Sequence, residues 1–168
     1  MNNVMRIAFL CFFASHIPIT LLIDGQSIFP QHFYPQGARN LYDFYTETFD
    51  DFLMARDQSP LWLKSVVCCE FLLQWPFFWF ACYCLMNRSN KLRIPAIAYG
   101  AHTATTLVPI LSEFALSPLP LLSKAILFLF YLPYLLFPLA IMLLAMHGDL
   151  FDETTSTCVR PKLRAKAH

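Results

Sequence analysis

Long apolar stretches alternate with shorter polar connections along this chain. Four of these stretches carry almost no charge, whereas the connections between them hold most of the acids and bases. At 1.5 Å per residue, an α-helix of about 20 residues crosses the roughly 30 Å hydrocarbon core of a bilayer. The pattern therefore predicts four transmembrane helices, at residues 5–23, 61–86, 94–116 and 119–146.

The connection between the first two stretches has a helical period of its own. Between residues 40 and 53, apolar side chains recur every three or four positions and acids fill the positions between them. The apolar members are Leu41, Phe44, Tyr45, Phe49, Phe52 and Leu53. We expect a short amphipathic helix that lies over one mouth of the bundle. The predicted fold class is an all-α membrane protein, a four-transmembrane-helix bundle with this amphipathic helix in a lumenal loop.

Proline occurs inside every predicted membrane helix. The residues concerned are Pro18, Pro76, Pro109, Pro133 and Pro138. Each proline removes a backbone hydrogen bond and bends its helix, so we expect proline-kinked helices. Bends of this kind are tolerated in membranes where a cavity or neighbouring groups absorb them. The prolines favour a pocket inside the bundle, although adjustment of helix tilt and packing explains them equally well.

The composition agrees with a membrane protein. Hydrophobic residues make up 57% of the 168 residues and charged residues 14%, against about 25% charged in an average soluble domain. Seventeen phenylalanines would be hard to bury in one soluble core of this size, whereas in a bilayer they can face lipid. The length suits one membrane domain at residues 1–147, followed by a flexible cytosolic tail at residues 148–168.

Charge and motif content exclude several classes of function. The net charge is +1 and the basic residues form no broad face, so nucleic acid is not an expected partner. The sequence contains no P-loop, dinucleotide fingerprint, nucleophile elbow or zinc-ligand spacing. We therefore expect neither a cofactor nor a metal ion.

The charges of the connections predict the orientation in the membrane. The connection at residues 24–60 contains six acids and two arginines, whereas the short connection after the second stretch contains Arg88, Lys91 and Arg93 without an acid. Because basic residues mark the cytosolic side, both termini are predicted to be cytosolic and the long first connection lumenal. The acceptor sequence at Asn87 then lies in the cytosol. The last five residues resemble a degenerate retrieval signal of the endoplasmic reticulum.

Two acids lie where lipid should reject them. Glu70 lies well inside the second stretch and is followed one turn later by Gln74, while Asp24 closes the first stretch. A carboxylate at membrane depth costs several kcal/mol, so it must face the bundle interior, hold a proton or meet a cation. These acids are candidate ligand-binding groups. The alternative is a hydrogen bond between helices without any role in binding.

Other polar side chains share the faces of these acids. His16 and Thr20 lie eight and four residues before Asp24, which puts all three on one face of the first helix. The third stretch contains a polar cluster that includes Thr106, and Tyr134 of the fourth stretch can point its hydroxyl inward. Each of these side chains could line a pocket, or could instead satisfy its hydrogen bonds within and between helices.

Several motifs resemble those of the EXPERA family, which includes the emopamil-binding sterol isomerase. They occur in the family's order and with similar spacing from about residue 12 to residue 147. The matching segments are residues 15–24 (SHIPITLLID), 49–51 (FDD), 69–70 (CE), 74–78 (QWPFF), 102–110 (HTATTLVPI) and 133–138 (PYLLFP).

The resemblance is to the receptor branch of this family, and it implies a function. It implies a receptor that binds cationic amphiphilic amines and sterols or oxysterols within the membrane. Such a receptor acts in cholesterol homeostasis through the Niemann–Pick type C cholesterol transporter. The resemblance further implies a homodimer in the endoplasmic reticulum membrane, with the nuclear envelope, lysosomal membrane and plasma membrane as further locations.

The resemblance also assigns roles to individual residues. Asp24 matches the acid that pairs with the ligand amine, and Glu70 matches the acid that hydrogen-bonds with it. Asp51 matches a lumenal acid that is needed for binding, which we expect to act by supporting the loop. The remaining matched pocket positions are His16, Gln74, Thr106 and Tyr134.

An enzyme is the alternative to a receptor. Sterol double-bond isomerisation passes through a carbocation and needs a proton donor, a base and carboxylates that stabilise positive charge. The isomerase branch has a histidine one turn before the first acid, where this chain has Thr20. Because threonine cannot shuttle a proton near neutral pH, we favour the binding protein over a sterol isomerase, and leave a transport or scaffold role open.

Overall fold

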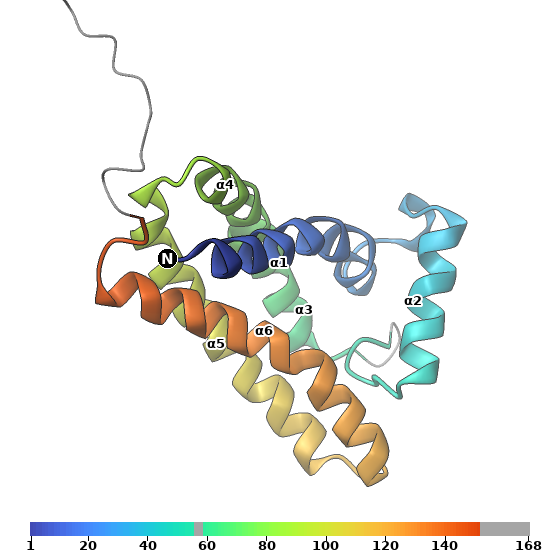
Figure 1. Ribbon diagram of the computed structural model, residues 1–168. Helices are drawn as coiled ribbons and strands as arrows, with labels where there is room; N and C mark the ends of the chain where they lie inside the picture. Colours follow the sequence, from blue (N-terminus) through green and yellow to red (C-terminus); the bar gives the residue numbers. More distant parts are fainter. Residues whose placement is uncertain (56–58, 152–168) are drawn as a thin grey trace, which may run out of the picture.

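The computed structural model describes residues 1–55 and 59–151, which form helices joined by short turns without any strand (Figure 1). Four spans in these ranges are long and apolar enough to cross a membrane, at Asn3–Ser27, Leu61–Met86, Asn90–Leu116 and Leu121–His147. The predicted class, an all-α protein with four membrane helices, is therefore confirmed. The predicted retrieval signal at residues 164–168 lies outside the described residues, as does the predicted tail from residue 152 onward.

The first span begins earlier than predicted and ends in a 3₁₀ turn that was not predicted. Helix α1 (Asn3–Leu22) starts after Asn2, whose side chain accepts a hydrogen bond from the Met5 N–H at 2.9 Å. With this cap the helix begins two residues before the predicted start. The helix continues through Pro18 and then tightens into the 3₁₀ turn η1 (Asp24–Ser27). Asp24 therefore lies at the first position of an irregular turn and not at the end of a regular helix.

The second span contains a π-helical turn that the apolar pattern did not predict. It consists of α3 (Leu61–Cys69), the π turn η3 (Glu70–Gln74) and α4 (Trp75–Met86). Pro76 has no N–H to donate, and in a regular helix its ring would clash with the carbonyl four residues earlier. The wider turn, closed by the Trp75 N–H on the Glu70 carbonyl, lies directly before Pro76 and can accommodate its ring. Glu70 begins the widened turn.

The third and fourth spans form an antiparallel hairpin that is in contact along its length (Figure 1). Helix α5 (Arg93–Leu116) follows the 3₁₀ turn η4 (Asn90–Leu92), and α6 (Leu121–His147) begins after Pro120. At Gly100 the two helices approach so closely that a Cβ atom there would lie 2.5 Å from both the Met142 Cβ and the Pro138 carbonyl oxygen. Glycine at this position allows the close packing.

The loop helix is displaced along the chain relative to its prediction. Helix α2 (Gln36–Thr48) follows the 3₁₀ turn η2 (Gln31–Phe33) and lies at the end of the bundle away from the N-terminus (Figure 1). The sequence predicted residues 40–53. The helix starts directly after Pro35, a residue that fits a helix start, and it ends before Asp50, whose positive φ of 56° is incompatible with an α-helix.

The helices pack as two pairs with a space between them. Helix α1 packs on α4 and α5 packs on α6, whereas contacts between the two pairs are sparse. A hydrophobic cluster fills the end of the bundle near the N-terminus, and its fully buried members include Phe13, Phe78 and Ile141. A second cluster, around Tyr42 and Phe114, fills the end that carries α2. The two pairs are thus joined mainly at their ends.

The first residues of the predicted tail are packed against the bundle. Phe151 donates its N–H to the Asn90 Oδ1 at 2.8 Å, and the Asn90 Nδ2 donates to the Phe151 carbonyl at 2.7 Å. Leu150 and Phe151 are both buried in the cluster near the N-terminus. At the same end, Arg88 donates to the Asn3 side chain at 2.8 Å. The start of α1, the connection between α4 and α5 and the end of α6 therefore lie together.

Candidate functional site

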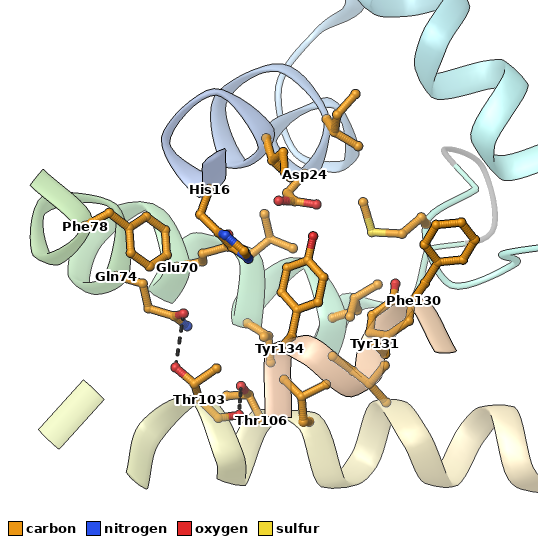
Figure 2. Close-up of a pocket in the computed structure, with 18 of the residues that line it drawn as sticks. His16, Asp24, Glu70, Gln74, Phe78, Thr103, Thr106, Phe130, Tyr131 and Tyr134 are labelled. Atoms are coloured by element: carbon orange, nitrogen blue, oxygen red, sulfur yellow. Dashed lines mark hydrogen bonds between the residues drawn. The ribbon is translucent and has the colours of Figure 1, made fainter. Parts of the chain in front are cut away.

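A cavity of about 310 Å³ lies between the two helix pairs, at the lower end of the volumes typical of small-molecule sites. Side chains of all four membrane spans line it, together with Leu41 and Tyr45 of α2 and the neighbouring Met54. The structure places all six residues that the sequence identified as pocket-lining in this one cavity. They are His16, Asp24, Glu70, Gln74, Thr106 and Tyr134 (Figure 2).

The two acids of the cavity come from the two irregular turns. Asp24 opens η1 and Glu70 opens η3, and their carboxyl groups are close enough to share a hydrogen bond. Thr20, which is fully buried, donates its hydroxyl proton to the Glu70 Oε1 at 2.5 Å. Because an ionised carboxylate can only accept hydrogen bonds, a bond between two carboxyl groups requires that one of them carries a proton. In this arrangement the pair therefore holds at least one proton and at most one negative charge.

No lysine or arginine is found among the described residues that line the cavity. The other lining residues are predominantly Ile, Leu, Val, Phe and Tyr. The remaining charge of the pair therefore has no cationic side chain as a partner within the cavity. Buried charges in proteins are normally paired, so the chemistry of this cavity suits a cationic group.

The imidazole of His16 is held by aromatic neighbours on three sides. The ring centroids of Phe12, Tyr134 and Phe78 lie 4.0, 4.6 and 5.6 Å from that of His16. Its Nδ1 lies 2.6 Å from the Phe12 carbonyl oxygen, one helical turn earlier. Figure 2 shows the ring reaching into the cavity from α1 between Phe78 and Tyr134. Packing and hydrogen bonding together fix its orientation.

A second polar group in the cavity links α5 to the π turn. The Thr103 hydroxyl donates to the Gln74 Oε1 at 3.2 Å, so the amide of Gln74 is oriented by the neighbouring helix (Figure 2). Thr106 instead donates its hydroxyl to the backbone carbonyl of Thr103 at 2.9 Å. Thr106 thus lines the cavity while its proton is used within its own helix. Thr103 is a lining residue that the sequence placed only in a general polar cluster.

Asp51 lies beside the cavity and does not line it. The carboxylate is fully buried and accepts hydrogen bonds from the Tyr45 hydroxyl at 2.7 Å, the Tyr131 hydroxyl at 2.9 Å and the Met54 N–H at 3.2 Å. All three donors belong to residues that do line the cavity. Asp51 therefore connects α2, the following loop and α6 around one end of the cavity, which is the arrangement expected of a supporting residue.

Burial controls the electrostatics of Asp51. Desolvation raises the pKa of its carboxyl group above the ordinary value of 3.8, while the hydrogen bonds from the two tyrosines and from the backbone act in the opposite direction. The same burial, together with the Asp51 charge, raises the pKa of Tyr45. The Tyr45 hydroxyl therefore remains protonated and acts as a donor at neutral pH.

Several lining aromatics were not identified from the sequence. The aromatic residues concerned, which contribute to the cavity wall, are Phe78, Tyr99, Phe130 and Tyr131. Aromatic side chains are so frequent in the apolar stretches that their identity does not separate cavity-facing from lipid-facing positions. The one usable signal was the spacing of four between Gln74 and Phe78, which places them on one face.

The fold and the cavity define a class: a four-helix membrane protein with an acid pair in an intramembrane pocket. Residues 38–145 match the EXPERA (EXPanded EBP superfamily) model, and the chain belongs to that family. The family resemblance noted in the sequence is thereby confirmed.

Three similar proteins from vertebrates carry a receptor name. Sigma intracellular receptor 2 of Xenopus tropicalis is 43% identical over 155 residues, which cover 86% of this chain and 90% of the relative. The proteins of the same name from Homo sapiens and Macaca fascicularis are each 38% identical over 153 residues, covering 83% of this chain and 86% of the relative.

Proposed function

We propose that this protein is an intracellular membrane receptor that binds cationic amphiphiles and sterols, including oxysterols and cholesterol, in the cavity between the two helix pairs. The observation that carries the proposal is a pair of carboxyl groups in a mainly apolar cavity whose described lining residues include no lysine or arginine. A ligand that brings one ammonium group and a large apolar body matches both properties. The receptor names of the relatives support this function.

The two acids take different roles in the proposed binding mode. Asp24 keeps the negative charge and pairs with the ligand ammonium. Glu70 holds the shared proton and donates it to Asp24, while its Oε1 accepts the Thr20 hydroxyl proton. In a site of low dielectric, an ion pair with Asp24 is strong because little water screens it. Glu70 then orients Asp24 without adding a second negative charge.

Thr20 supports binding of the ligand without its chemical conversion. An isomerase needs a group that gives and takes a proton at carbon. The Thr20 hydroxyl is fully buried and committed to Glu70, and it does not ionise near neutral pH. We infer that ligands leave the cavity chemically unchanged, and that the protein influences cholesterol homeostasis and trafficking as a sterol-binding partner of the Niemann–Pick type C cholesterol transporter.

We propose that the protein resides in the endoplasmic reticulum membrane, with the nuclear envelope, lysosomal membrane and plasma membrane as further locations. The proposed assembly is a homodimer. The proposed orientation has both termini in the cytosol. Arg88 and Arg93 support this orientation, because they lie at the same end of the bundle as the start of α1 and the end of α6. Basic residues at one end of a membrane bundle mark its cytosolic side.

The test is an asymmetry between two isosteric variants. Asp24→Asn removes the counter-ion, so binding of a radiolabelled amphiphilic amine should be abolished. Glu70→Gln retains a hydrogen-bond donor and should keep most of the affinity, with a loss of about 1–2 kcal/mol. Saturation binding on membranes, normalised to expression, measures both. Glu113→Gln, which removes an exposed acid of α5 outside the cavity, is the matched control and should bind as the wild type does.

Three results would count against this assignment. Unchanged binding of the amine to Asp24→Asn would show that the amine does not bind at Asp24 in this cavity. A larger loss in Glu70→Gln than in Asp24→Asn would place the charge on the other acid. Conversion of an 8-ene sterol to its 7-ene isomer by the purified wild type, above a Glu70→Gln background, would show that the protein is an isomerase and contradict the receptor assignment.

A further inference from the structure

His16 carries a ring nitrogen for which the described residues provide no hydrogen-bond partner. The side chain is 6% exposed, and its Nε2 is buried without a donor or acceptor within reach. Leaving a buried polar atom unsatisfied is unfavourable, and such atoms are rare in folded proteins. Because His16 lines the cavity, its Nε2 is an unused polar group at a site built to receive a ligand.

The hydrogen bond at the other ring nitrogen determines what Nε2 can offer. Nδ1 lies 2.6 Å from the Phe12 carbonyl oxygen, and a carbonyl oxygen can only accept. Nδ1 therefore carries the proton, and in the neutral ring Nε2 keeps its lone pair and is an acceptor. The contacts with Phe12, Phe78 and Tyr134 prevent the ring from turning this lone pair elsewhere.

The acceptor and the acid pair are the two ends of a long polar axis. His16 lies eight residues before Asp24, which corresponds to roughly 12 Å along α1. Gln74 lies beside the His16 end, one turn from Phe78, and its Oε1 is occupied by Thr103. The rest of the wall is mainly apolar or aromatic, with Thr103 and Thr106 as polar exceptions. A ligand that satisfies both ends must carry its second polar group remote from its amine.

We propose that His16 is a specificity-determining residue whose Nε2 accepts a hydrogen bond from a hydroxyl or N–H group at the end of the ligand opposite to its amine. This inference rests on the proposed function and narrows its ligand class. The preferred ligand is an amphiphile with a cationic amine at the Asp24 end and a neutral hydrogen-bond donor at the His16 end, separated by an apolar body.

The experiment compares three amines that differ only at the remote end. An N-alkyl piperidine with a terminal phenol is measured beside its methyl ether and its unsubstituted phenyl parent. In the wild type the phenol should bind about 3- to 10-fold more tightly than either analogue, as expected of one additional hydrogen bond. In His16→Phe, which keeps an aromatic ring at this position, the preference for the phenol should disappear while the phenyl parent still binds.

The chain offers a matched control for the histidine substitution. His102 of α5 also has a buried Nε2 without a partner among the described residues, but it does not line the cavity. His102→Phe should therefore retain the full preference for the phenol. A purely structural role of His16 would lower the affinity of all three ligands together and leave their ratio unchanged.

The outcomes separate this inference from the proposed function. Failure of all three amines to bind the wild type would overturn the proposed function itself. Binding of all three without a preference for the phenol, or a preference that survives in His16→Phe, would overturn the role of His16 alone. A wild-type preference for the ether that His16→Phe abolishes would show a protonated Nε2 and refute the acceptor assignment.

A second measurement does not depend on the folding of a variant. With ¹⁵N-labelled histidine, the resonance of a ring nitrogen that bears a lone pair is distinct from that of a protonated one. The His16 Nε2 of the free wild type should show the lone-pair signal, and this signal should shift on addition of the phenol but not of the phenyl parent. A protonated Nε2 in the free protein would refute the proposal.

Discussion

Asp51 is held by a dense set of hydrogen bonds. It is a fully buried carboxylate with three hydrogen-bond donors and no cationic partner among the described residues, and two of the donors are tyrosines of α2 and α6. Hydrogen bonds to a charged group are worth about 1.5–3 kcal/mol each, but they must offset the desolvation of the charge. The raised pKa of Asp51 shows that desolvation dominates in this balance.

This balance predicts a pH dependence of stability. Between the ordinary pKa of 3.8 and the raised pKa of the folded state, the folded protein keeps a proton on Asp51 that the unfolded chain has lost. Stability should therefore fall as the pH rises through this window and level off above it. Asp51→Asn should make this decline shallower and leave the part contributed by the protonated Asp24–Glu70 pair, whereas Glu47→Gln, an exposed acid on α2, should preserve the full slope. Thermal unfolding in lipid nanodiscs across the window measures the slopes, and a parallel decline in Asp51→Asn and wild type would contradict the assignment.

At the level of elements, the length of each apolar stretch predicted a membrane helix but not the irregular turns within that helix. The four spans were predicted to within a few residues, because a hydrocarbon core imposes a minimum length on any apolar helix. The π turn at Glu70 was not predicted, because it arises from how Pro76 is accommodated and has no hydropathy signal. The loop helix was predicted with shifted bounds, because the positive φ of Asp50 is a backbone property that apolar spacing does not report.

The hairpin of α5 and α6 gives a test at this level. Gly100→Ala would place a methyl group 2.5 Å from the Pro138 carbonyl oxygen, which cannot move without displacing the α6 backbone. We expect a loss of about 1–3 kcal/mol in stability, as for other overpacked sites. Gly37→Ala in α2 has open space around the new methyl group and should instead gain about 0.5–1 kcal/mol.

Thermal unfolding in detergent micelles compares the two alanine variants directly. Because both changes add one methyl group to a helical glycine, the difference in sign isolates the contact between α5 and α6. Equal melting temperatures for the two variants would show that the hairpin is not closely packed at Gly100.

At the level of the whole molecule, the cavity follows from how the helices pair. The sequence identified both acids and four further lining residues, because polar groups at membrane depth are costly and therefore informative. It did not identify the aromatic wall or the pairing of α1 with α4 and α5 with α6. Those features depend on which apolar face meets another helix and which meets lipid, and the two faces have the same composition.

Orientation is a property of the whole molecule that glycosylation can test. Native Asn87 is exposed and part of an Asn-Arg-Ser acceptor, yet it should remain unmodified in microsomes if its end of the bundle is cytosolic, as we propose. The double substitution Gln36→Asn and Ala38→Ser creates an Asn-Gly-Ser acceptor at the start of α2, which should be glycosylated. A mobility shift that disappears with endoglycosidase is the readout. Modification at Asn87 with none at residue 36 would invert the orientation.

The π turn has a consequence for how this helix can change over evolutionary time. A π turn is geometrically equivalent to an α-helix that has received one inserted residue. The lipid-facing Leu72 and Leu73 lie in this turn, and deletion of either would restore a regular helix. Regular geometry would then bring the Pro76 ring against a carbonyl. The insertion and the proline are therefore expected to be gained or lost together among related chains, and an alignment gap beside Glu70 should coincide with a replaced proline.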